Sequence, residues 1–369
     1  MTKKKPRNAN IELARITACL IVIGCHVYYS LTLPGIGPNL NNFIRCVFSD
    51  GVAIFWLISG FFLFRKGYVD TLKSSLVKIG LPLLLYSIVV FYFGRIFQYD
   101  MSLSESVSHT ADDYLNILKG ILSFSNAIDG IGQTWYMYLY LFIVVFLYPI
   151  MKPFIDKMDL NSKIEKLYII ISGCLILLND ISFNTFLEVE HRGIRGAFYA
   201  SILLIWGHII YRHKNIIFKK KYATLYLVLF IVVNIVRSLL LGSLSNVLNG
   251  DNIIHWYTSF GLICSICVLG FFMSFNDIKD AAGNVIRFIG AQTLNIYIIH
   301  GFPMWTMENK GVYTLIQQYL ESNISNLILA DILCLLVLIL LVFIISCVIS
   351  IIINLFVSLL KLLKKRISS

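Results

Sequence analysis

Three ionisable side chains stand in the first hydrophobic segment of the chain: Glu12, Arg15 and His26. A charged residue at the centre of a bilayer costs about 2.5–3.5 kcal/mol on insertion scales, so such residues are by default candidates for a functional site. Arg15 and His26 are eleven positions apart, which on an α-helix is a rotation of about 1,100° and a rise of about 16 Å. We therefore expect both side chains on one face of a helix, at different depths.

Glu12 precedes Arg15 by three residues. On a helix this spacing lets the two side chains pair, which would hold the guanidinium near the membrane edge. A purely structural interpretation is the alternative, in which Arg15 extends to the interface and His26 packs inside a helical bundle. The shared face, with an acid beneath it, favours the functional interpretation.

The composition predicts which elements must position these residues. Of the 369 residues, 58% are hydrophobic and 14% are charged, far from the usage of a soluble domain. Most of the chain lies in apolar runs of about 20 residues, enough to cross the hydrocarbon core. The runs are continuous and rich in Ile, Leu and Phe, unlike the alternating strands of an outer-membrane barrel. We expect an all-α, polytopic integral membrane helical bundle of about ten transmembrane helices in a lipid bilayer.

The predicted spans and domain limits follow from the same runs. Residues 11–360 form one transmembrane domain between basic tails at 1–10 and 361–369. The longest polar connection, 98–133, is predicted to be the largest segment outside the cytoplasm, with an amphipathic helix near 114–122. The predicted spans are 13–33, 44–64, 79–97, 134–155, 166–181, 194–211, 222–243, 256–275, 286–306 and 328–360.

The formal net charge of +11 is distributed in a way that indicates membrane topology rather than nucleic-acid binding. One set of alternate connections and both tails carry 23 of the 31 Lys and Arg residues, and the opposite connections, with Arg237 counted among them, carry seven. By the positive-inside rule both termini are cytoplasmic and the number of spans is even. We expect a multi-pass protein of the cell membrane of a bacterium.

The eight cysteines lie mostly within apolar runs and are interpreted as small packing residues. Cys264 and Cys267 form a C-x-x-C pattern, but no His or acid lies near them in the sequence. We therefore expect no metal and no permanently bound cofactor.

Several segments together resemble the membrane acyltransferase-3 family, over most of the chain. They are Arg15 followed after ten residues by His26, the Phe55-Trp-Leu-Ile-Ser-Gly-Phe61 segment, the basic loop that leads to Pro82, the aromatic segment 134–138 with Tyr148-Pro149, and the Tyr297-Ile-Ile-His300 segment. One departure is that Lys73 and Lys78 stand where the family often has arginine pairs, which weakens the case for a bidentate phosphate contact there.

The resemblance implies transfer of an acyl group, usually acetyl, from cytoplasmic acyl-CoA to a sugar hydroxyl. The partners would be acetyl-CoA as donor substrate and, as acceptor, an exported glycan or its lipid-linked precursor. Some members of the family have a second, hydrolase-like domain, and we expect none after the last predicted span. We therefore expect the membrane part itself to complete the transfer.

The chemistry of that reaction assigns roles to residues. The phosphates of CoA need cations at the cytoplasmic edge, which Arg15, Arg65, Lys66 and Lys78 supply on the predicted topology. Acyl transfer to an alcohol needs a general base, and a neutral histidine suits that role near pH 7, so His26 is the predicted base. An acyl-His26 intermediate is the other route that the sequence leaves open.

Asp50 is predicted to lie at the depth of His26, where it could orient the imidazole and stabilise the imidazolium. Its alternative is a position at the mouth of the second span, facing water. Four further residues are candidates for contact with the acceptor or for structural support: Glu12, Ser59, Trp135 and His300. For Trp135 the alternatives are a place in the aromatic belt and stacking on a sugar.

Two other classes of function compete with an enzyme. In a transporter or flippase, buried Arg, Glu and His would form an ion or proton pathway. That class is disfavoured because no matching pair of Gly/Pro-broken spans occurs in the two halves of the chain. A non-catalytic assembly partner would be favoured if His26 proved replaceable.

Overall fold

The computed structural model describes residues 7–122, 134–181, 193–243 and 257–367. In these ranges all the regular secondary structure is helical and there is no β-strand, so the predicted all-α class is confirmed. The helices are α1 (Ala9–Tyr29), α2 (Pro38–Phe48), α3 (Gly51–Leu63), α4 (Tyr68–Ser75), η1 (Leu76–Gly80), α5 (Leu81–Tyr99), α6 (Leu103–Ser106), α7 (Ala111–Leu122), α8 (Trp135–Phe142), η3 (Ile143–Leu147), α9 (Tyr148–Leu160), α10 (Ser162–Ile181), α11 (Gly193–Arg212), α12 (Lys214–Ile217), η4 (Lys220–Tyr222), α13 (Ala223–Ser243), α15 (Ser259–Met273), α16 (Ala281–Ile299), α17 (Gly301–Asn309), α18 (Val312–Asn323) and α19 (Leu327–Ile367).

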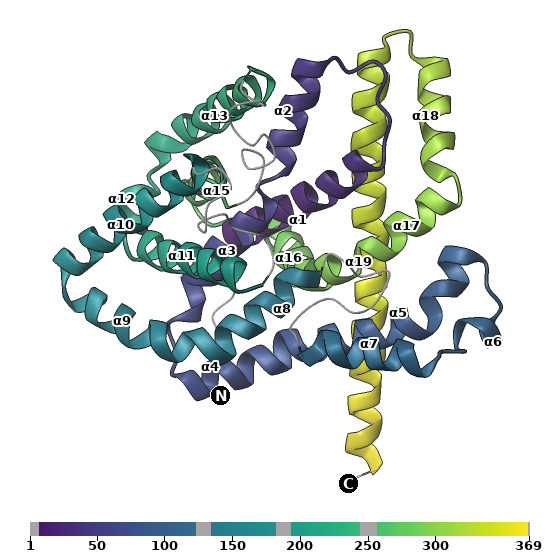
Figure 1. Cartoon of the computed structure of the whole chain (residues 1–369), viewed down its shortest axis with the longest axis horizontal. Coiled ribbons are helices and arrows are strands. Elements are labelled where there is room, and N and C mark those ends of the chain that lie inside the picture. The colour runs from purple at the N-terminus through teal and green to yellow at the C-terminus, as the bar shows by residue number, and fades with distance from the viewer. Residues whose placement is uncertain (1–6, 123–133, 182–192, 244–256, 368–369) are drawn as a thin grey trace.

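Helix α1 lies at the centre of the molecule (Figure 1). The side chain of Asn8 caps its first turn by accepting a hydrogen bond from the amide of Ile11, which satisfies one of the free N–H groups of a helix start. The helix packs against α3, α15, α16 and α19. Because neighbours surround α1, the polar side chains that it carries are held in the interior of the bundle.

The ten predicted spans all lie mainly on helices, but their number is not established. Six helical segments in the described part of the chain are both long and apolar enough to cross a membrane, so the chain is an integral membrane protein. These six are Ala9–Tyr29, Pro38–Leu63, Tyr68–Phe97, Trp135–Leu160, Lys220–Gly242 and Leu327–Leu355. Helix α15 is apolar but shorter, with 15 residues. A count of ten therefore stays a prediction.

Two of these helical segments contain a π-helical turn just before a proline. Leu76–Gly80 precedes Pro82, and Ile143–Leu147 precedes Pro149. Proline lacks an N–H group and its ring clashes with the carbonyl four residues earlier, so the helix widens locally to accommodate it. The freed carbonyl of Val145 accepts a hydrogen bond of 2.9 Å from the hydroxyl of Tyr68, which ties α4 to η3.

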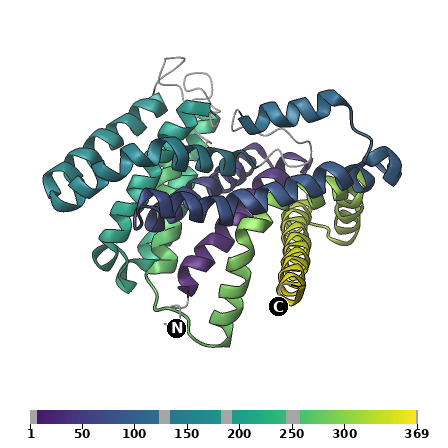
Figure 2. The same ribbon diagram turned by 90° about the horizontal axis from the view of Figure 1, so that it is seen from below.

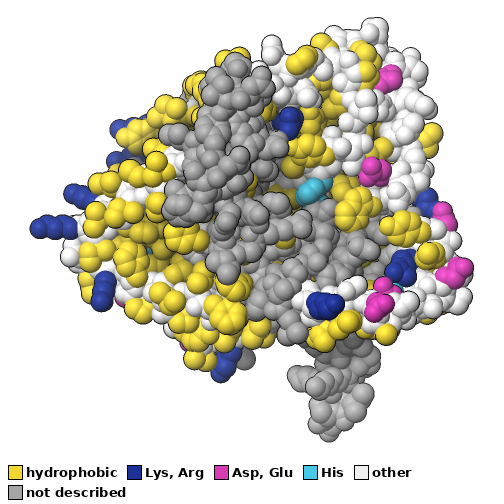
Figure 3. Space-filling view, viewed as in Figure 1, with side chains coloured by type: hydrophobic (Ala, Val, Ile, Leu, Met, Phe, Trp, Pro, Cys, Tyr) yellow, Lys and Arg dark blue, Asp and Glu magenta, His cyan; other side chains and the backbone are white. Residues whose placement is uncertain are grey.

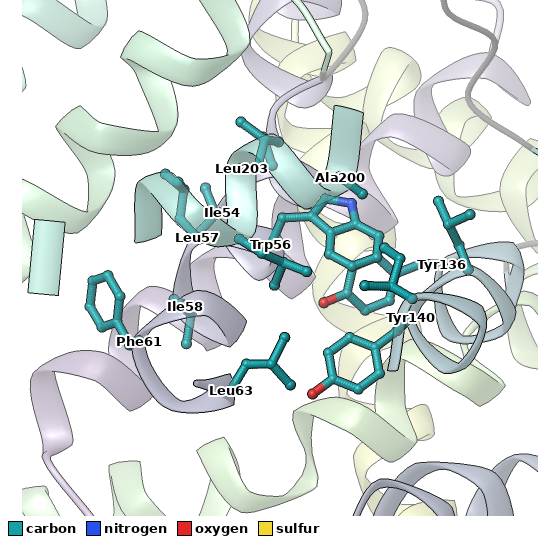
Figure 4. Packing of buried hydrophobic residues seen from close by; sticks show 14 of the residues in the cluster. Ile54, Trp56, Leu57, Ile58, Phe61, Leu63, Tyr136, Tyr140, Ala200 and Leu203 are labelled. Atoms are coloured by element: carbon teal, nitrogen blue, oxygen red, sulfur yellow. The ribbon is translucent and has the colours of Figure 1, made fainter. Parts of the chain in front are cut away.

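The largest hydrophobic core is formed where α3, α8 and α11 meet (Figure 4). The fully buried ring of Trp56 lies 4.2 Å from that of Tyr136, centre to centre, and Ala200 and Leu203 of α11 lie beside it. Helices α3 and α11 can approach closely because Gly60 has no side chain. A Cβ atom there would overlap the main-chain oxygen of Leu204. The contact between Trp56 and Tyr136 joins α3 to α8, whose Tyr136 takes part in the contacts described below.

The surface is apolar where lipid would contact it. In Figure 3 hydrophobic side chains cover much of the left-hand part of the face, whereas Asp and Glu side chains gather over the right-hand part. Helices α5, α13 and α19 each expose rows of Leu, Ile and Val. Figure 2 views α19 nearly end-on and shows α5 passing beside it.

The ends of the described chain differ slightly from the predicted tails. Helix α1 begins at Ala9, inside the predicted tail 1–10, and α19 is one helix of 41 residues that continues to Ile367. The boundary predicted at 360 therefore falls inside a helix. Residues 1–6 and 368–369 of the predicted tails, and 123–133 of the predicted outer segment, lie outside the described residues.

Candidate active site

Arg15 and Glu12 form the ion pair that their spacing predicts. An Nη atom of Arg15 lies 2.7 Å from Oε1 of Glu12. The Glu12 side chain is 2% exposed and that of Arg15 is 23% exposed. A Cβ atom at Gly290 of α16 would overlap the Glu12 side chain, so this glycine lets α16 cover the acid. The buried carboxylate thus holds a guanidinium that still reaches the surface.

A cluster of cations surrounds two aromatic rings beside this pair. The guanidinium carbons of Arg15 and Arg65 lie 5.6 Å and 4.7 Å from the centre of the Phe62 ring, and that of Arg65 lies 4.2 Å from the centre of the Tyr211 ring. The ammonium of Lys214 donates a hydrogen bond of 2.9 Å to the Tyr211 hydroxyl. We call these five residues the cation cluster. Among the described acids, only Glu12 forms an ion pair with a member of it, and cations of this kind attract anions.

The sequence predicted Arg15 and Arg65 in the cation cluster but missed Phe62, Tyr211 and Lys214. Tyr211 lies at the end of the predicted span 194–211, and Lys214 lies in the connection after it, which was used only as a count of basic charge. An aromatic residue three positions before a lysine at a helix end was the available signal, since such a ring can hold the ammonium.

Lys66 and Lys78, the other predicted donor-site cations, are both exposed. The main-chain carbonyl of Lys66 accepts a hydrogen bond from the hydroxyl of Tyr148, and Lys78 stands on the π-helical turn η1. Their contact with a phosphate stays a prediction.

His26 and His300 lie together at the other end of the site. Their ring centres are 5.5 Å apart. His300 is 0% exposed, and its Nδ1 lies 2.7 Å from the carbonyl oxygen of Tyr297. Because a carbonyl oxygen can only accept, Nδ1 carries the proton and Nε2 presents a lone pair. That Nε2 atom is buried and has no hydrogen-bond partner among the described residues.

A polar and aromatic lining connects the histidines with the cation cluster. The Tyr297 ring lies 5.7 Å from that of His300 and 5.5 Å from that of Tyr136. The hydroxyls of Tyr136 and Ser59 lie 3.1 Å apart, and Ser59 precedes Phe62 of the cation cluster by one helical turn. Helices α1, α3, α8 and α16 therefore contribute to one chain of side-chain contacts between the two groups.

Asp50 does not orient His26 in this structure. Its Oδ1 atom accepts a hydrogen bond of 2.8 Å from Arg237, and both side chains are 0% exposed. In the described part of the chain no hydrogen bond joins Asp50 to His26. The predicted contact is wrong because a buried guanidinium on α13 satisfies the carboxylate instead. Arg237, counted with the outer connections, lies inside α13, and its charge within an apolar run was the signal for this pair.

Trp135 begins α8 and is half-buried, with its ring centre 6.5 Å from that of Tyr136. This place fits either an interfacial position or contact with a sugar, so the two alternatives from the sequence stay open.

The geometry defines an integral membrane protein whose helices carry a cluster of cations and a pair of histidines in contact. The model of the acyltransferase domain family matches residues 8–355. The chain belongs to this family, the acyltransferase-3 family, and is a membrane acyltransferase. Comparisons with curated proteins and with solved structures give no match.

Proposed function

We propose that the protein transfers an acyl group, acetyl in the first instance, from acyl-CoA in the cytoplasm to a sugar hydroxyl. The acceptor is an exported glycan or its lipid-linked precursor, and the protein acts in the cell membrane with both termini in the cytoplasm. His26 is the general base, and the cation cluster binds the phosphates of the donor.

The observation that carries this proposal is the contact between His26 and His300. The Nε2 lone pair of His300 is unpaired among the described residues and buried beside the His26 ring. When His26 takes a proton it becomes a cation, and a neighbouring acceptor nitrogen can then stabilise its N–H group. His300 is thus suited to the positioning role that the sequence assigned to Asp50.

The proposed position of the donor follows from the separation of Arg15 and His26 along α1. Arg15 and His26 lie eleven residues apart on the continuous helix α1, a rise of about 16 Å. In CoA the pantetheine arm separates the phosphates from the thioester. Phosphates at Arg15 and Arg65 would therefore leave the arm to extend along Ser59 and Tyr136 toward the histidines.

The transfer step balances with these residues alone. The acceptor oxygen attacks the thioester carbonyl carbon while His26 takes the hydroxyl proton. The carbon–sulfur bond then breaks, and His26 returns the proton to the departing sulfur, which gives the ester and the free thiol of CoA. Transfer through an acyl-His26 intermediate uses the same nitrogen.

Purified protein incubated with radiolabelled acetyl-CoA and candidate glycans tests the proposal. We expect label in the glycan with wild type and a loss of about 100-fold or more with His26→Ala, because a general base contributes about 10²–10⁴-fold. Cys25→Ala is the matched control, since Cys25 is the half-buried neighbour of His26 on the same helix, and we expect it to retain activity.

Retention of more than about a tenth of the activity by His26→Ala would remove the base from the proposal. Movement of a sugar or lipid across the membrane by wild type without acyl transfer would favour the transporter class instead.

A further inference from the structure

A cavity of about 310 Å³ lies between α5, α7 and α8, outside the site described above. Its walls are mostly apolar, with Leu84 and Ile88 from α5, Ile117 from α7 and Leu141 from α8. Helix α7 runs alongside α5 in both views (Figures 1 and 2). The lining residues Leu84 and Ile88 are exposed, and they stand on a helix long and apolar enough to span the membrane, so this side of the cavity would face the bilayer.

Hydroxyl groups also line this apolar space. Ser87 lines the cavity with a side chain that is 4% exposed, and Tyr138 lines it from α8. Toward the end of α5, the hydroxyls of Tyr92 and Tyr114 lie 3.5 Å apart and bridge α5 and α7. The space is therefore a slot with an apolar body and hydroxyls along one side.

A cation stands beyond the end of the slot. Arg95 follows the lining residue Phe91 by one helical turn and is half-buried, and no described acid lies within 4.0 Å of it. The Asp113 carboxylate, which Arg95 influences, accepts hydrogen bonds of 2.8 Å and 3.0 Å from the amide and hydroxyl of Thr110. These bonds, more than Arg95, hold the pKa of the Asp113 carboxyl below its ordinary value. Arg95 thus remains available to an anion such as a phosphate.

Two helices near the slot also carry or precede residues of the candidate active site. The rings of Phe97 on α5 and Phe302 on α17 lie 5.7 Å apart, and Phe302 follows His300 by two residues. On the other side, Tyr138 lines the cavity and follows Tyr136 by two residues on α8. Helices α17 and α8 therefore connect the surroundings of the slot with the segments that carry His300 and Tyr136.

We propose that this slot binds the hydrocarbon chain of a lipid-linked acceptor, a single-chain lipid phosphate that carries the sugar to be acylated. The phosphate lies at Arg95 and the sugar extends toward His300. The volume is at the lower end of the range of about 300–1,000 Å³ for ligand pockets, which suits one chain rather than the two of a phospholipid. This inference rests on the proposed function, because it names the substrate class that the same site would take.

A photoreactive farnesyl phosphate, with the protein in phosphatidylcholine nanodiscs, tests the inference. We expect labelled peptides from α5 and α7. Unlabelled farnesyl phosphate should compete about tenfold better than farnesol, since one charge-assisted contact is worth about that factor. It should also compete better than phosphatidylglycerol, whose two chains do not fit a slot for one. Equal competition by phosphatidylglycerol would mean that the slot holds ordinary bilayer lipid, which overturns the proposal.

Two variants and a control separate the chain from the phosphate. Ser87→Leu fills the slot and should reduce labelling about tenfold, because it displaces buried methylene groups of the ligand. Arg95→Gln should abolish the preference for farnesyl phosphate over farnesol. Leu85→Phe changes a partly exposed residue of α5 that does not line the slot, and it should label as wild type does. Full labelling of Ser87→Leu, or an unchanged preference in Arg95→Gln, contradicts the proposal.

The failure of this inference can be told apart from the failure of the proposed function. Acyl-CoA binding is measured in every variant, which also verifies that each is folded. If wild type transfers acetyl to a soluble sugar but shows no specific labelling, the slot is not the acceptor site. If labelling is specific but acetyl-CoA neither binds nor reacts, the acyltransferase proposal fails and the slot remains a lipid site.

Discussion

Asp50 and Arg237 form an ion pair of 2.8 Å in which both side chains are fully buried. The pair joins the start of α3 to the middle of α13, and Arg237 donates a second hydrogen bond, of 3.1 Å, to the main-chain oxygen of Cys46. Taking two charges out of water is costly, and their attraction offsets that cost only while both are present. The pair therefore holds α2, α3 and α13 together.

Asp50→Asn should destabilise the protein, because it leaves the Arg237 charge buried without its partner. Removing one member of a buried pair costs about 3–5 kcal/mol, which should appear as a large drop in Tm in detergent. The double variant Asp50→Leu with Arg237→Met removes both charges and should recover most of the stability. Asp70→Asn, at an exposed acid, is the control. An Asp50→Asn protein with the Tm of wild type and a reduced kcat would return Asp50 to the catalytic role.

The two ends of the bundle are predicted to lie on opposite sides of the membrane, and the ion pairs agree with this grouping. Asp100 pairs with Lys310, both in segments predicted to be outside. Asp277 pairs with Arg287, both in a segment predicted to be cytoplasmic.

A single cysteine in place of exposed Ser104 of α6, in a variant with the eight native cysteines replaced, should react with a membrane-impermeant maleimide in intact cells. A cysteine in place of exposed Ser162 is the matched position and should react only after permeabilisation. The reverse pattern would invert the assigned topology.

The helices were predictable because long apolar runs dominate the sequence. The ion pair of Glu12 with Arg15 was predictable for a local reason, since three residues on one helix bring the side chains together. Contacts between distant segments were not. A single sequence does not specify which helices are neighbours, so Asp50 was assigned to His26 when its partner stands on α13.

Contacts within the candidate active site were also not predictable from a single sequence. His26 and His300 were each candidates on their own, yet their contact depends on α1 packing against α16. The cation cluster was half predictable, because Arg65 lies in a basic connection whereas Tyr211 reaches it only through the packing of α11 on α3.

His300→Asn should lower kcat by about 100-fold, the lower bound for losing acid–base assistance. The asparagine amide can still donate to the Tyr297 carbonyl, but it lacks an acceptor at the position of Nε2. The KM for acyl-CoA and the Tm should stay near the wild-type values, which separates this role from a structural one. His208→Asn is the control, since His208 pairs with Asp159 at 2.9 Å. A fall in Tm that matches the loss of activity would show that His300 only supports the fold.

Arg15→Lys should weaken donor binding without affecting the acceptor. Lysine keeps the charge but loses the planar guanidinium, which both stacks on Phe62 and presents two parallel donors to a phosphate. We expect a higher KM for acyl-CoA, an unchanged KM for the acceptor, and a Kd for acyl-CoA raised about tenfold in calorimetry on solubilised protein.

Phe62→Leu gives an independent test of the cation cluster, because the ring of Phe62 lies within 6 Å of the guanidinium carbons of both Arg15 and Arg65. Losing this contact should weaken donor binding by a smaller factor than Arg15→Lys, since a cation–π contact at an exposed site is worth about 0.5–1 kcal/mol. Combining the two substitutions should cost less than the sum of their separate effects, because both act through the position of the Arg15 guanidinium. Lys219→Ala removes an exposed charge from the same predicted side but outside the cluster, and its Kd should equal that of wild type. If Arg15→Lys binds acyl-CoA as tightly as wild type, Arg15 serves only its ion pair with Glu12, and the donor phosphates must bind elsewhere.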